Sequence, residues 1–388
     1  MSKTDLLEEN KITMWSEEKI RDFRVTLLQW YDENKRDLPW RQTDNPYYIW
    51  VSEIMLQQTQ VDTVIPYYER FIETLPTIEA LANAPEATLL KLWEGLGYYS
   101  RVRNMKVAAN QIMEYHDGEF PTSHDDALSL KGIGPYTAGA VTSIAFNQAY
   151  PAVDGNVMRV LSRLFEIDLD ISKASTRKVF EEMIRQLIDP DRPGDFNQAL
   201  MDLGATICTP KNYFPEKSPV RDFNASYVNE TWEKYPVKKK KNKVKEQTFL
   251  TIVIKNEKEE YLFRKRSSKG VLMGMLTPIM LNQDDLTDSG WKTFNQEEFI
   301  QSRSSEEIEE MIRENYDLII SLNEQPKGVL THVFSHLKWQ MIVFEASLIS
   351  DQSHSAELKW IHPNQFEEEM FPMPTQKINN LIKTLTLF

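Results

Sequence analysis

The stretch "LKGIGPYTAGAVTSIAF", residues 130–146, is apolar enough to form a buried helix, but its first third is interrupted. Gly132, Gly134 and Pro135 prevent a helix from running through the start of the stretch. The residues after Pro135 favour a new helix that begins there. The pattern therefore predicts a helix, a short glycine turn and a second helix, which is a helix-hairpin-helix.

The glycine turn has a chemical consequence for the helix that follows it. Gly132 and Gly134 can adopt positive φ or allow a close approach, and the second helix starts with free N–H groups and the positive end of its dipole. Such an arrangement binds a phosphate and positions DNA without reading its sequence. An ordinary αα-corner, with glycine required for packing, is the alternative that the motif alone leaves open.

The composition describes a globular chain with more than one domain. It has 388 residues, of which 41% are hydrophobic and 27% charged, so two or three domains are expected. The first twenty residues lack the apolar core of a signal peptide, and no later run is long enough to span a bilayer; a cytoplasmic location without membrane association follows. The net charge of −13 argues mildly against a nucleic-acid partner, although a local basic face can coexist with it.

The first two hundred residues have the apolar spacing of helices. Ile20, Phe23, Leu27 and Tyr31 form such a stripe within "EEKIRDFRVTLLQWYDE". Similar stripes occur at 78–114 and 173–188. We therefore predict a helical domain over residues 1–232.

The basic run "PVKKKKNKVK", residues 236–245, separates this region from one of different pattern. Beyond it, "QTFLTIVIKNEKEEYLFRKR" and "WQMIVFEASLI" are β-branched and aromatic runs, and "SSEEIEEMIRENY" predicts one helix. We therefore predict a linker at 233–246 and a small α+β domain at 247–388.

Two carboxylates lie where helices are expected to begin. In "WVSEIMLQQTQV", Glu53 is placed in the first turn of an amphipathic helix, between Val51 and Ile54. In "VDGNVMR", Asp154 precedes a glycine and a helical stripe, which puts its carboxylate at a helix N-terminus. A dipole-stabilised surface glutamate and a simple helix cap are the structural alternatives.

A third segment, "EGLGYYSRVRNMK" at 94–106, combines paired glycines, two tyrosines and three basic residues. This mixture is expected of a loop that inserts into a base step and holds the DNA backbone.

Together, "LPWRQTDNPYYIWVSEIMLQQTQV", "LWEGLGYYSRVRNMK", "LKGIGPYTAGAV" and "AVDGNVMRVLSRL" resemble the MutY-type adenine DNA glycosylases of the helix-hairpin-helix base-excision repair family. The resemblance covers nearly the whole chain. It implies a mainly α N-terminal helix-hairpin-helix glycosylase fold, with the hairpin at about 125–146, followed by an α+β Nudix-like C-terminal domain. It also implies a cytoplasmic, bacterial-type, nucleoid-associated monomer that acts on double-stranded DNA.

The family removes adenine mispaired with 8-oxoguanine, and the same activity is expected opposite guanine. The nucleotide must leave the stack before its N-glycosidic bond can be reached, and cleavage passes through an oxocarbenium-like transition state. By resemblance, Glu53 protonates adenine N7, and its apolar surroundings keep it partly neutral. Asp154 stays ionised and either stabilises or transiently traps the C1′ cation before water attacks. Tyr136 and Asn156 line the same site, with Tyr136 expected to donate a hydrogen bond to Asp154.

The resemblance assigns further residues to binding. Trp40 and Arg41 are expected near the flipped adenine and Gln198 at its edge; Gln58 and Tyr98 are expected in the DNA stack; Lys131, Gly132 and Gly134 are expected at a backbone phosphate; and Phe334, Ser335 and His336 are expected at 8-oxoguanine. A serine hydroxyl can both accept from the N7–H of that base and donate to its O8. The C-terminal segment "EEIEEMIRENY" lacks the glutamate arrangement of a working Nudix enzyme, so metal-dependent pyrophosphate hydrolysis is not expected.

Tyr136 distinguishes two reaction types. Endonuclease III-like relatives with lyase activity have a lysine at this position, whose amine forms a Schiff base with the sugar. A phenol cannot form one, so the resemblance implies a monofunctional glycosylase. A bifunctional glycosylase/lyase and a non-catalytic helix-hairpin-helix DNA-binding protein remain as alternatives. Binding alone would not require Glu53, Tyr136, Asp154 and Asn156 together.

Most relatives carry four cysteines, spaced C-x6-C-x2-C-x5-C, that hold a [4Fe–4S] cluster. In this chain the corresponding positions in the loop 208–224 are Cys208, Pro215, Ser218 and Asn224. Cys208 is the single cysteine of the chain, which also excludes internal disulfides. We therefore expect a clusterless member with no cofactor and no metal.

Overall fold

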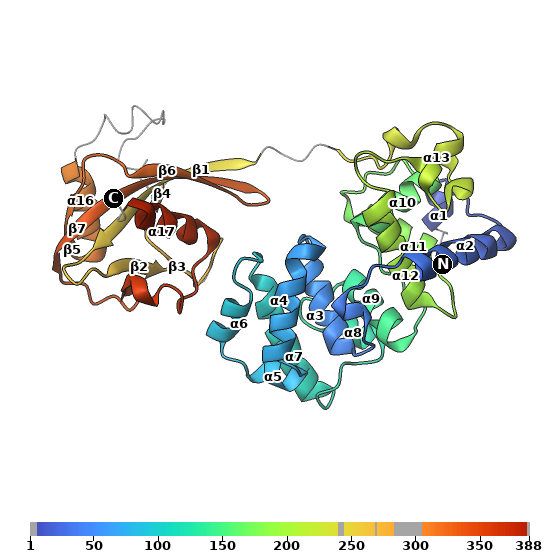
Figure 1. Cartoon of the computed structure of the whole chain (residues 1–388), viewed down its shortest axis with the longest axis horizontal. Coiled ribbons are helices and arrows are strands. Elements are labelled where there is room, and N and C mark those ends of the chain that lie inside the picture. The colour runs from blue at the N-terminus through green and yellow to red at the C-terminus, as the bar shows by residue number, and fades with distance from the viewer. Residues whose placement is uncertain (1–5, 240–243, 268–269, 283–304, 386–388) are drawn as a thin grey trace. The chain divides into compact units, whose positions relative to one another are not determined.

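The structure is a computed structural model that describes residues 6–239, 244–267, 270–282 and 305–385. The chain divides into two compact units (Figure 1). The helical unit comprises the described residues of 1–92 and 100–240, and the sheet unit comprises those of 93–99 and 241–388. No helix in the described ranges is both long and apolar enough to cross a membrane.

The helical unit is built from α-helices joined by short connections. Their bounds are α1 Leu6–Glu9, α2 Glu17–Asn34, α3 Pro46–Leu56, α4 Val61–Thr74, α5 Ile78–Asn83, α6 Glu86–Leu92, α7 Ser100–Tyr115, α8 His124–Ser129, α9 Pro135–Phe146, α10 Gly155–Leu164, α11 Ala174–Leu187, α12 Pro193–Asp202 and α13 Ala225–Val228. Helix α2 is the predicted stripe at 17–33, and the side chain of Ser16 caps it by accepting from the Lys19 N–H.

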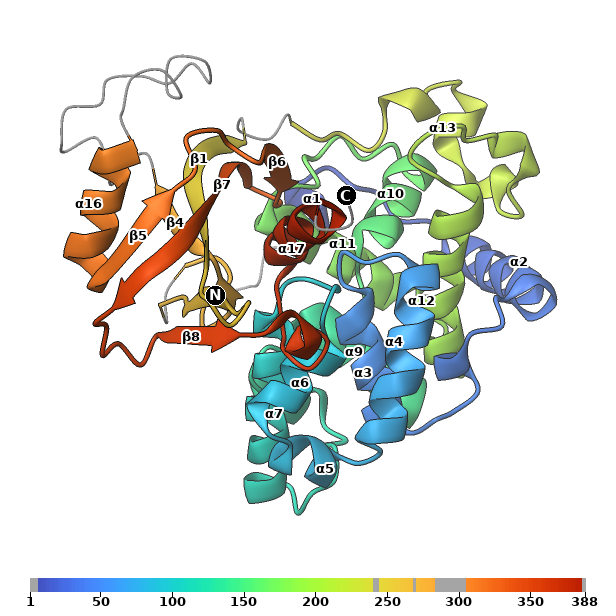
Figure 2. The ribbon, with the colours of Figure 1, turned by 60° about the vertical axis from the view of Figure 1, so that its left-hand side comes forward.

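The core of the helical unit lies where α2, α10, α11 and α12 meet. Phe23, Leu161, Phe180 and Phe196 are fully buried there, one from each of these helices. Helix α3 packs against α9, and α9 packs against α12, so three segments that are far apart in the sequence lie side by side (Figure 2). This arrangement brings the predicted catalytic segments together.

The sheet unit contains one eight-stranded sheet with the path β3-β2-β1-β7-β5; β4 also pairs with β1, β6 with β7, and β8 with β2. The strands are β1 Lys245–Lys255, β2 Tyr261–Lys265, β3 Leu276–Thr277, β4 Ile279–Asn282, β5 Leu318–Leu322, β6 Gly328–Val333, β7 Leu337–Asp351 and β8 Leu358–Ile361. Strands β1 and β7 are parallel, and every other pair is antiparallel.

Strand β1 begins earlier than predicted. The sequence places the second domain from residue 247, but β1 starts at Lys245, because its parallel pairing with β7 already includes Lys245 opposite Leu337. The predicted linker 233–246 also contains residues 240–243, which lie outside the described residues.

Alternating side chains of β1 bury both faces of the sheet. Leu250, Ile252 and Ile254 pack with Ile308 and Ile312 of α16 (Ser305–Tyr316). The intervening residues Phe249 and Val253 join a second cluster with Ile378 and Ile382 of α17 (Met373–Leu385). The predicted helix near 304–316 is α16, whereas α17 was missed. The predicted fold class, a helical unit followed by a Nudix-type α+β unit, is confirmed.

Candidate active site

A cavity of about 600 Å³ opens in the helical unit between α3, the glycine hairpin, α9, α10 and α12. Its size is within the usual range of ligand pockets. Of the predicted site residues, ten contribute to its wall: Trp40, Arg41, Glu53, Gln58, Gly132, Gly134, Tyr136, Asp154, Asn156 and Gln198. The fold therefore collects into one cavity residues that the sequence separates by more than a hundred positions.

Helix α3 carries Glu53 into a buried position. It begins at Pro46, where the Asn45 side chain accepts from the Tyr47 N–H, and proline suits the first helical position. Glu53 is consequently the eighth of eleven helical residues, and its predicted place in the first turn was wrong. The helix is buried on nearly all sides, so the Glu53 side chain is only 5% exposed.

The surroundings of Glu53 favour its neutral form. Burial raises its pKa from an ordinary value near 4.5 to about 7. The hydrogen bond from Tyr136 and the charge of Arg41 lower the pKa, while the nearby Asp154 raises it. A carboxyl with a pKa near neutrality can hold a proton and donate it, as a general acid must.

The phenol of Tyr136 contacts Glu53 and not the expected Asp154. Its Oη donates to Glu53 Oε2 at 2.5 Å and lies 3.8 Å from the sulfur of Met201. The expected hydrogen bond to Asp154 was therefore wrong. The reason is tertiary, because α9 packs along α3 and brings the first turn of α9 against Glu53.

Asp154 caps helix α10, as predicted. Its Oδ1 accepts from the Val157 N–H and its Oδ2 from the Asn156 side-chain amide, both at 2.8 Å. These contacts stabilise the charged form. Burial outweighs them, however, and raises the pKa of Asp154 above its ordinary value. The helix terminus therefore offsets part of the cost of burying this carboxylate, while its pKa stays above the ordinary value.

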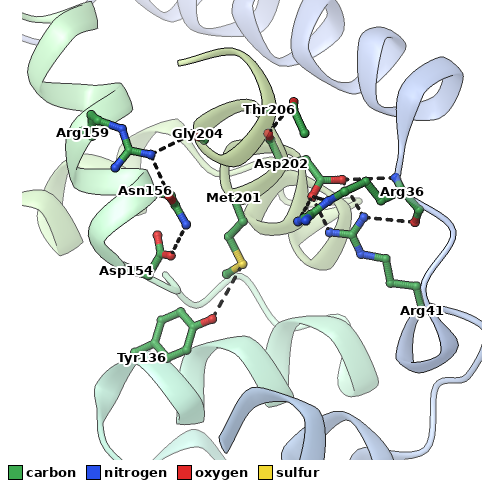
Figure 3. A network of polar contacts seen from close by, with 10 residues as sticks. All are labelled: Arg36, Arg41, Tyr136, Asp154, Asn156, Arg159, Met201, Asp202, Gly204 and Thr206. Carbon is green, nitrogen blue, oxygen red and sulfur yellow. Dashed lines mark hydrogen bonds and ion pairs between the residues drawn. The ribbon is translucent and has the colours of Figure 1, made fainter. Parts of the chain in front are cut away.

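A buried arginine that the sequence reasoning missed orients Asn156 (Figure 3). Arg159 Nη2 donates to Asn156 Oδ1 and to the Gly204 carbonyl, both at 2.7 Å, and its Nε donates to the Cys208 carbonyl at 2.7 Å. With Oδ1 facing the guanidinium, the amide nitrogen of Asn156 points at Asp154. The signal available in sequence was the three-residue spacing from Asn156 to Arg159 on one helix face.

The turn before α3 and helix α12 contribute further residues to the cavity. Trp40 is buried and packs edge-on against Tyr68, with ring centroids 5.3 Å apart, in the 3-10 turn Pro39–Arg41. Arg41 forms an ion pair with Asp202, a buried residue that was also missed. Gln198 lies one helical turn before Asp202 on α12. This four-residue spacing was the feature of the sequence that could have identified Asp202 as a residue of the site.

The hairpin has the predicted form, with α8 before it and α9 after it. Gly132 has a φ of +79°, and a Cβ there would lie 2.7 Å from the Cβ of Asn104. Gly134 is the N-cap of α9 and has open space around it. Lys131 is exposed, and its backbone N–H donates to the Gln111 side chain at 2.8 Å.

Two residues predicted to enter the DNA stack are exposed. Gln58 has a φ of +60° and follows α3 at the cavity. Tyr98, with a φ of +48°, lies in the connection between α6 and α7 and is 45% exposed. Positive φ is uncommon for residues with a side chain and is found at tight turns.

In the sheet unit, residues 334–336 form the turn between β6 and β7. The Phe334 ring packs inward on Trp339 and His332, at centroid distances of 4.8 and 4.5 Å. Ser335 and His336 are exposed. The turn therefore anchors itself by Phe334 and presents the two polar side chains.

The loop 208–224 does not fit a [4Fe–4S] cluster. Its four ligand positions, Cys208, Pro215, Ser218 and Asn224, are all buried, and they provide one thiol. Arg163 Nη1 donates to the Cys208 sulfur at 3.2 Å, and Asn224 donates to the Tyr213 hydroxyl at 2.9 Å. Within the described ranges, no group of three or more histidine, cysteine, aspartate or glutamate side chains could hold a metal ion.

Comparisons with known proteins identify the families that the two parts of the chain match. Residues 51–186 match the family model of the HhH-GPD superfamily base excision DNA repair proteins, and residues 250–381 match the NUDIX domain. The chain is 34% identical over 410 residues to the adenine DNA glycosylase of Schizosaccharomyces pombe, with 90% of this chain and 87% of that protein aligned.

Other relatives align over shorter parts of their own length. Identity to the adenine DNA glycosylase of Arabidopsis thaliana is 35%, covering 85% of this chain and 58% of that protein. Identity to the Homo sapiens adenine DNA glycosylase is 46%, covering 52% and 39%. Among solved structures, a thermostable thymine-DNA glycosylase is 28% identical, with a TM-score of 0.49 over 55% of this chain and 98% of that one.

Proposed function

The chain belongs to the adenine DNA glycosylase family, and from this premise we propose that it excises adenine mispaired with 8-oxoguanine, or with guanine, from duplex DNA. The observation that carries the proposal is that Glu53 and Asp154 line one cavity. A flipped nucleotide requires an enclosed pocket with an acid for the base and a carboxylate for the sugar.

Glu53 is the acid in this mechanism. With a pKa of about 7 it is about half protonated at neutral pH and largely protonated below it, and the protonated form donates its proton to adenine N7. The C1′–N9 bond then breaks, its electron pair leaves with adenine, and the sugar becomes an oxocarbenium ion. Tyr136 holds the other face of the acid by donating to Oε2.

Asp154 stabilises the sugar cation. Its carboxylate is fixed by Val157 and Asn156, so it requires little reorganisation when positive charge develops at C1′. Water then attacks C1′ and gives its proton to the Glu53 carboxylate, which restores the acid. The products are free adenine and an abasic site.

The hydrolysis is proposed to end there, without strand cleavage. A lyase requires an amine that attacks C1′ to form a Schiff base. Among the described residues that line the cavity there are arginines but no lysine, and the position after the hairpin is Tyr136. Arginine stays protonated and cannot replace that amine.

Recognition of the opposite base is assigned to the turn between β6 and β7. Its exposed Ser335 can accept from the N7–H that distinguishes 8-oxoguanine from guanine, and His336 lies beside it. Phe334 keeps the turn in place through its contact with Trp339.

The enzyme is further proposed to work without an iron–sulfur cluster. The contacts of Cys208 with Arg163 and of Asn224 with Tyr213 support this, because they engage two of the four buried ligand positions in hydrogen bonds within the protein. Iron and acid-labile sulfide should be absent from the purified protein. Stoichiometric iron would refute this part of the proposal.

The function is tested with end-labelled duplexes that carry one adenine opposite 8-oxoguanine, guanine, cytosine or thymine. Excess protein is added, and strand breaks are measured with and without hot alkali. Breaks that require alkali, and that form faster opposite 8-oxoguanine and guanine, are expected. Breaks without alkali would indicate a lyase, and binding without breaks would indicate a protein that binds DNA only.

A further inference from the structure

Asp202 is the last residue of α12 (Figure 3), and its side chain is 1% exposed. It accepts hydrogen bonds from two guanidinium groups. Arg36 Nη2 and Nε lie 2.5 and 2.8 Å from Oδ1, and Arg41 Nη1 and Nη2 lie 2.6 and 2.8 Å from Oδ2 and Oδ1. The contact of Arg41 with both oxygens is the strong, bidentate form of the arginine–carboxylate pair, whereas the two side-chain nitrogens of Arg36 share Oδ1.

Both arginines line the cavity in front of this carboxylate. Two positive charges are balanced by one negative charge, so the group carries a net charge of +1 at the cavity wall. Arg41 is the more buried partner, with an 11% exposed side chain against 30% for Arg36. Its charge is therefore screened less by solvent.

The charge of Arg41 acts on Glu53. Arg41 favours the ionised form of Glu53, and the other groups that face Glu53 are Tyr136 of α9 and Asp154 at the start of α10. Asp202 partly cancels the charge of Arg41. Any change in this balance changes how readily Glu53 keeps its proton.

We propose that Asp202 is a positioning residue that limits the charge of Arg41 felt by Glu53 and so sets the pH range in which the acid is protonated. This inference rests on the proposed function of Glu53. A purely structural role is the alternative, since Asp202 also accepts from the Arg36 backbone N–H at 3.4 Å and connects the turn before Trp40 to α12.

The two roles differ in the pH profile of the single-turnover rate, measured on the duplex with adenine opposite 8-oxoguanine. Asp202→Asn leaves Arg41 without its counter-charge, which favours ionised Glu53. The basic limb of the profile should therefore move to lower pH, by about half a unit to one unit for charges acting across an effective dielectric constant of ~20. Asp202→Glu keeps the carboxylate, so its basic limb should lie close to the pH of the wild-type limb.

Arg36→Gln gives the opposite prediction. With Arg36 neutral, Asp202 is left to Arg41 alone and cancels more of its charge, so the basic limb should move to higher pH. Asp195→Asn is the matched control, because Asp195 lies on the same helix and pairs with Arg192 at 2.7 Å in a partly exposed site. Its limb should coincide with that of the wild type.

Opposite shifts in the Asp202 and Arg36 variants would establish the proposal. Unmoved limbs in both, whatever the loss of rate, would overturn it and leave a structural role. The Arg36 variant decides the question even where Asp202→Asn fails to fold. Absence of adenine release by the wild type would instead refute the proposed function itself, so the two failures are distinct.

Discussion

The Tyr136 hydroxyl donates to Glu53 Oε2 at 2.5 Å, which joins the first turn after the glycine hairpin to the buried acid of α3. Tyr136, on which the proposal of a monofunctional reaction rests, therefore also has a direct contact with Glu53. It stabilises the ionised form of Glu53 and partly opposes the effect of burial. We therefore propose that Tyr136 both leaves the site without a Schiff-base amine and tunes the pKa of Glu53.

Tyr136→Phe should move the basic limb of the single-turnover pH profile to higher pH. The phenol hydrogen bond lowers the pKa of Glu53, so its removal leaves burial less opposed and raises that pKa further. A shift on the order of one pH unit or less is expected. A limb that moves to lower pH would contradict the assigned hydrogen bond.

The buried acid should also make stability depend on pH. A pKa near 7 in the folded state, against about 4.5 unfolded, means that the folded state binds the extra proton between these values. The free energy of unfolding contributed by Glu53 therefore falls as pH rises from 4.5 to 7, by up to about 3 kcal/mol.

Glu53→Gln removes this dependence while keeping a side chain of the same shape. Denaturant titrations at pH 5 and at pH 8 give the free energy of unfolding of both proteins. The difference, variant minus wild type, should be larger at pH 8 than at pH 5. Asp195→Asn serves as the surface control. An unchanged difference between Glu53→Gln and the wild type at the two pH values would contradict a raised pKa.

Arg159→Lys should reduce the single-turnover rate while duplex affinity stays close to that of the wild type. A lysine ammonium cannot reach Asn156, Gly204 and Cys208 in the planar geometry of a guanidinium. Asn156 then loses its fixed orientation toward Asp154, and since a misplacement of about 1 Å at a reacting site can cost roughly 10²-fold, a loss on the order of 10²-fold in rate is expected. A loss confined to DNA binding would argue against this role.

Gly132→Ala and Gly134→Ala should differ in stability. A Cβ at Gly132 would collide with Asn104 and sits on a backbone with φ of +79°, whereas a Cβ at Gly134 meets open space. Strain of this kind costs on the order of 1–3 kcal/mol. Thermal unfolding should show a lower Tm for the first variant and a nearly unchanged Tm for the second; equal losses would contradict the geometry.

Part of the site could be predicted from residues that are neighbours in the sequence. The hairpin is predictable because two glycines and a proline leave few backbone conformations, and the Asp154 cap because aspartate before a helical stripe satisfies free N–H groups. The start of α3 could also have been found, since Asn45 and Pro46 are a strong helix-start signal that the apolar pattern around Glu53 obscured.

Tertiary contacts were not predictable in this way. Tyr136 and Glu53 are 83 residues apart, and only the packing of α9 on α3 decides which carboxylate the phenol meets. The pairing of Asp202 with Arg36 and Arg41 spans 166 and 161 residues and has no local pattern. The roles of Gln58, Tyr98 and Ser335 in DNA recognition stay predictions.

Glu53 and Asp154 are proposed to release adenine together, and free adenine is the most direct measure of that reaction. Wild type, Glu53→Gln and Asp154→Asn are incubated in excess with a duplex that carries one labelled adenine opposite 8-oxoguanine, and the released base is quantified after separation. The wild type should release one adenine per duplex, and both variants should bind the duplex but release almost none. Equal release by either variant and the wild type would contradict the two-carboxylate mechanism.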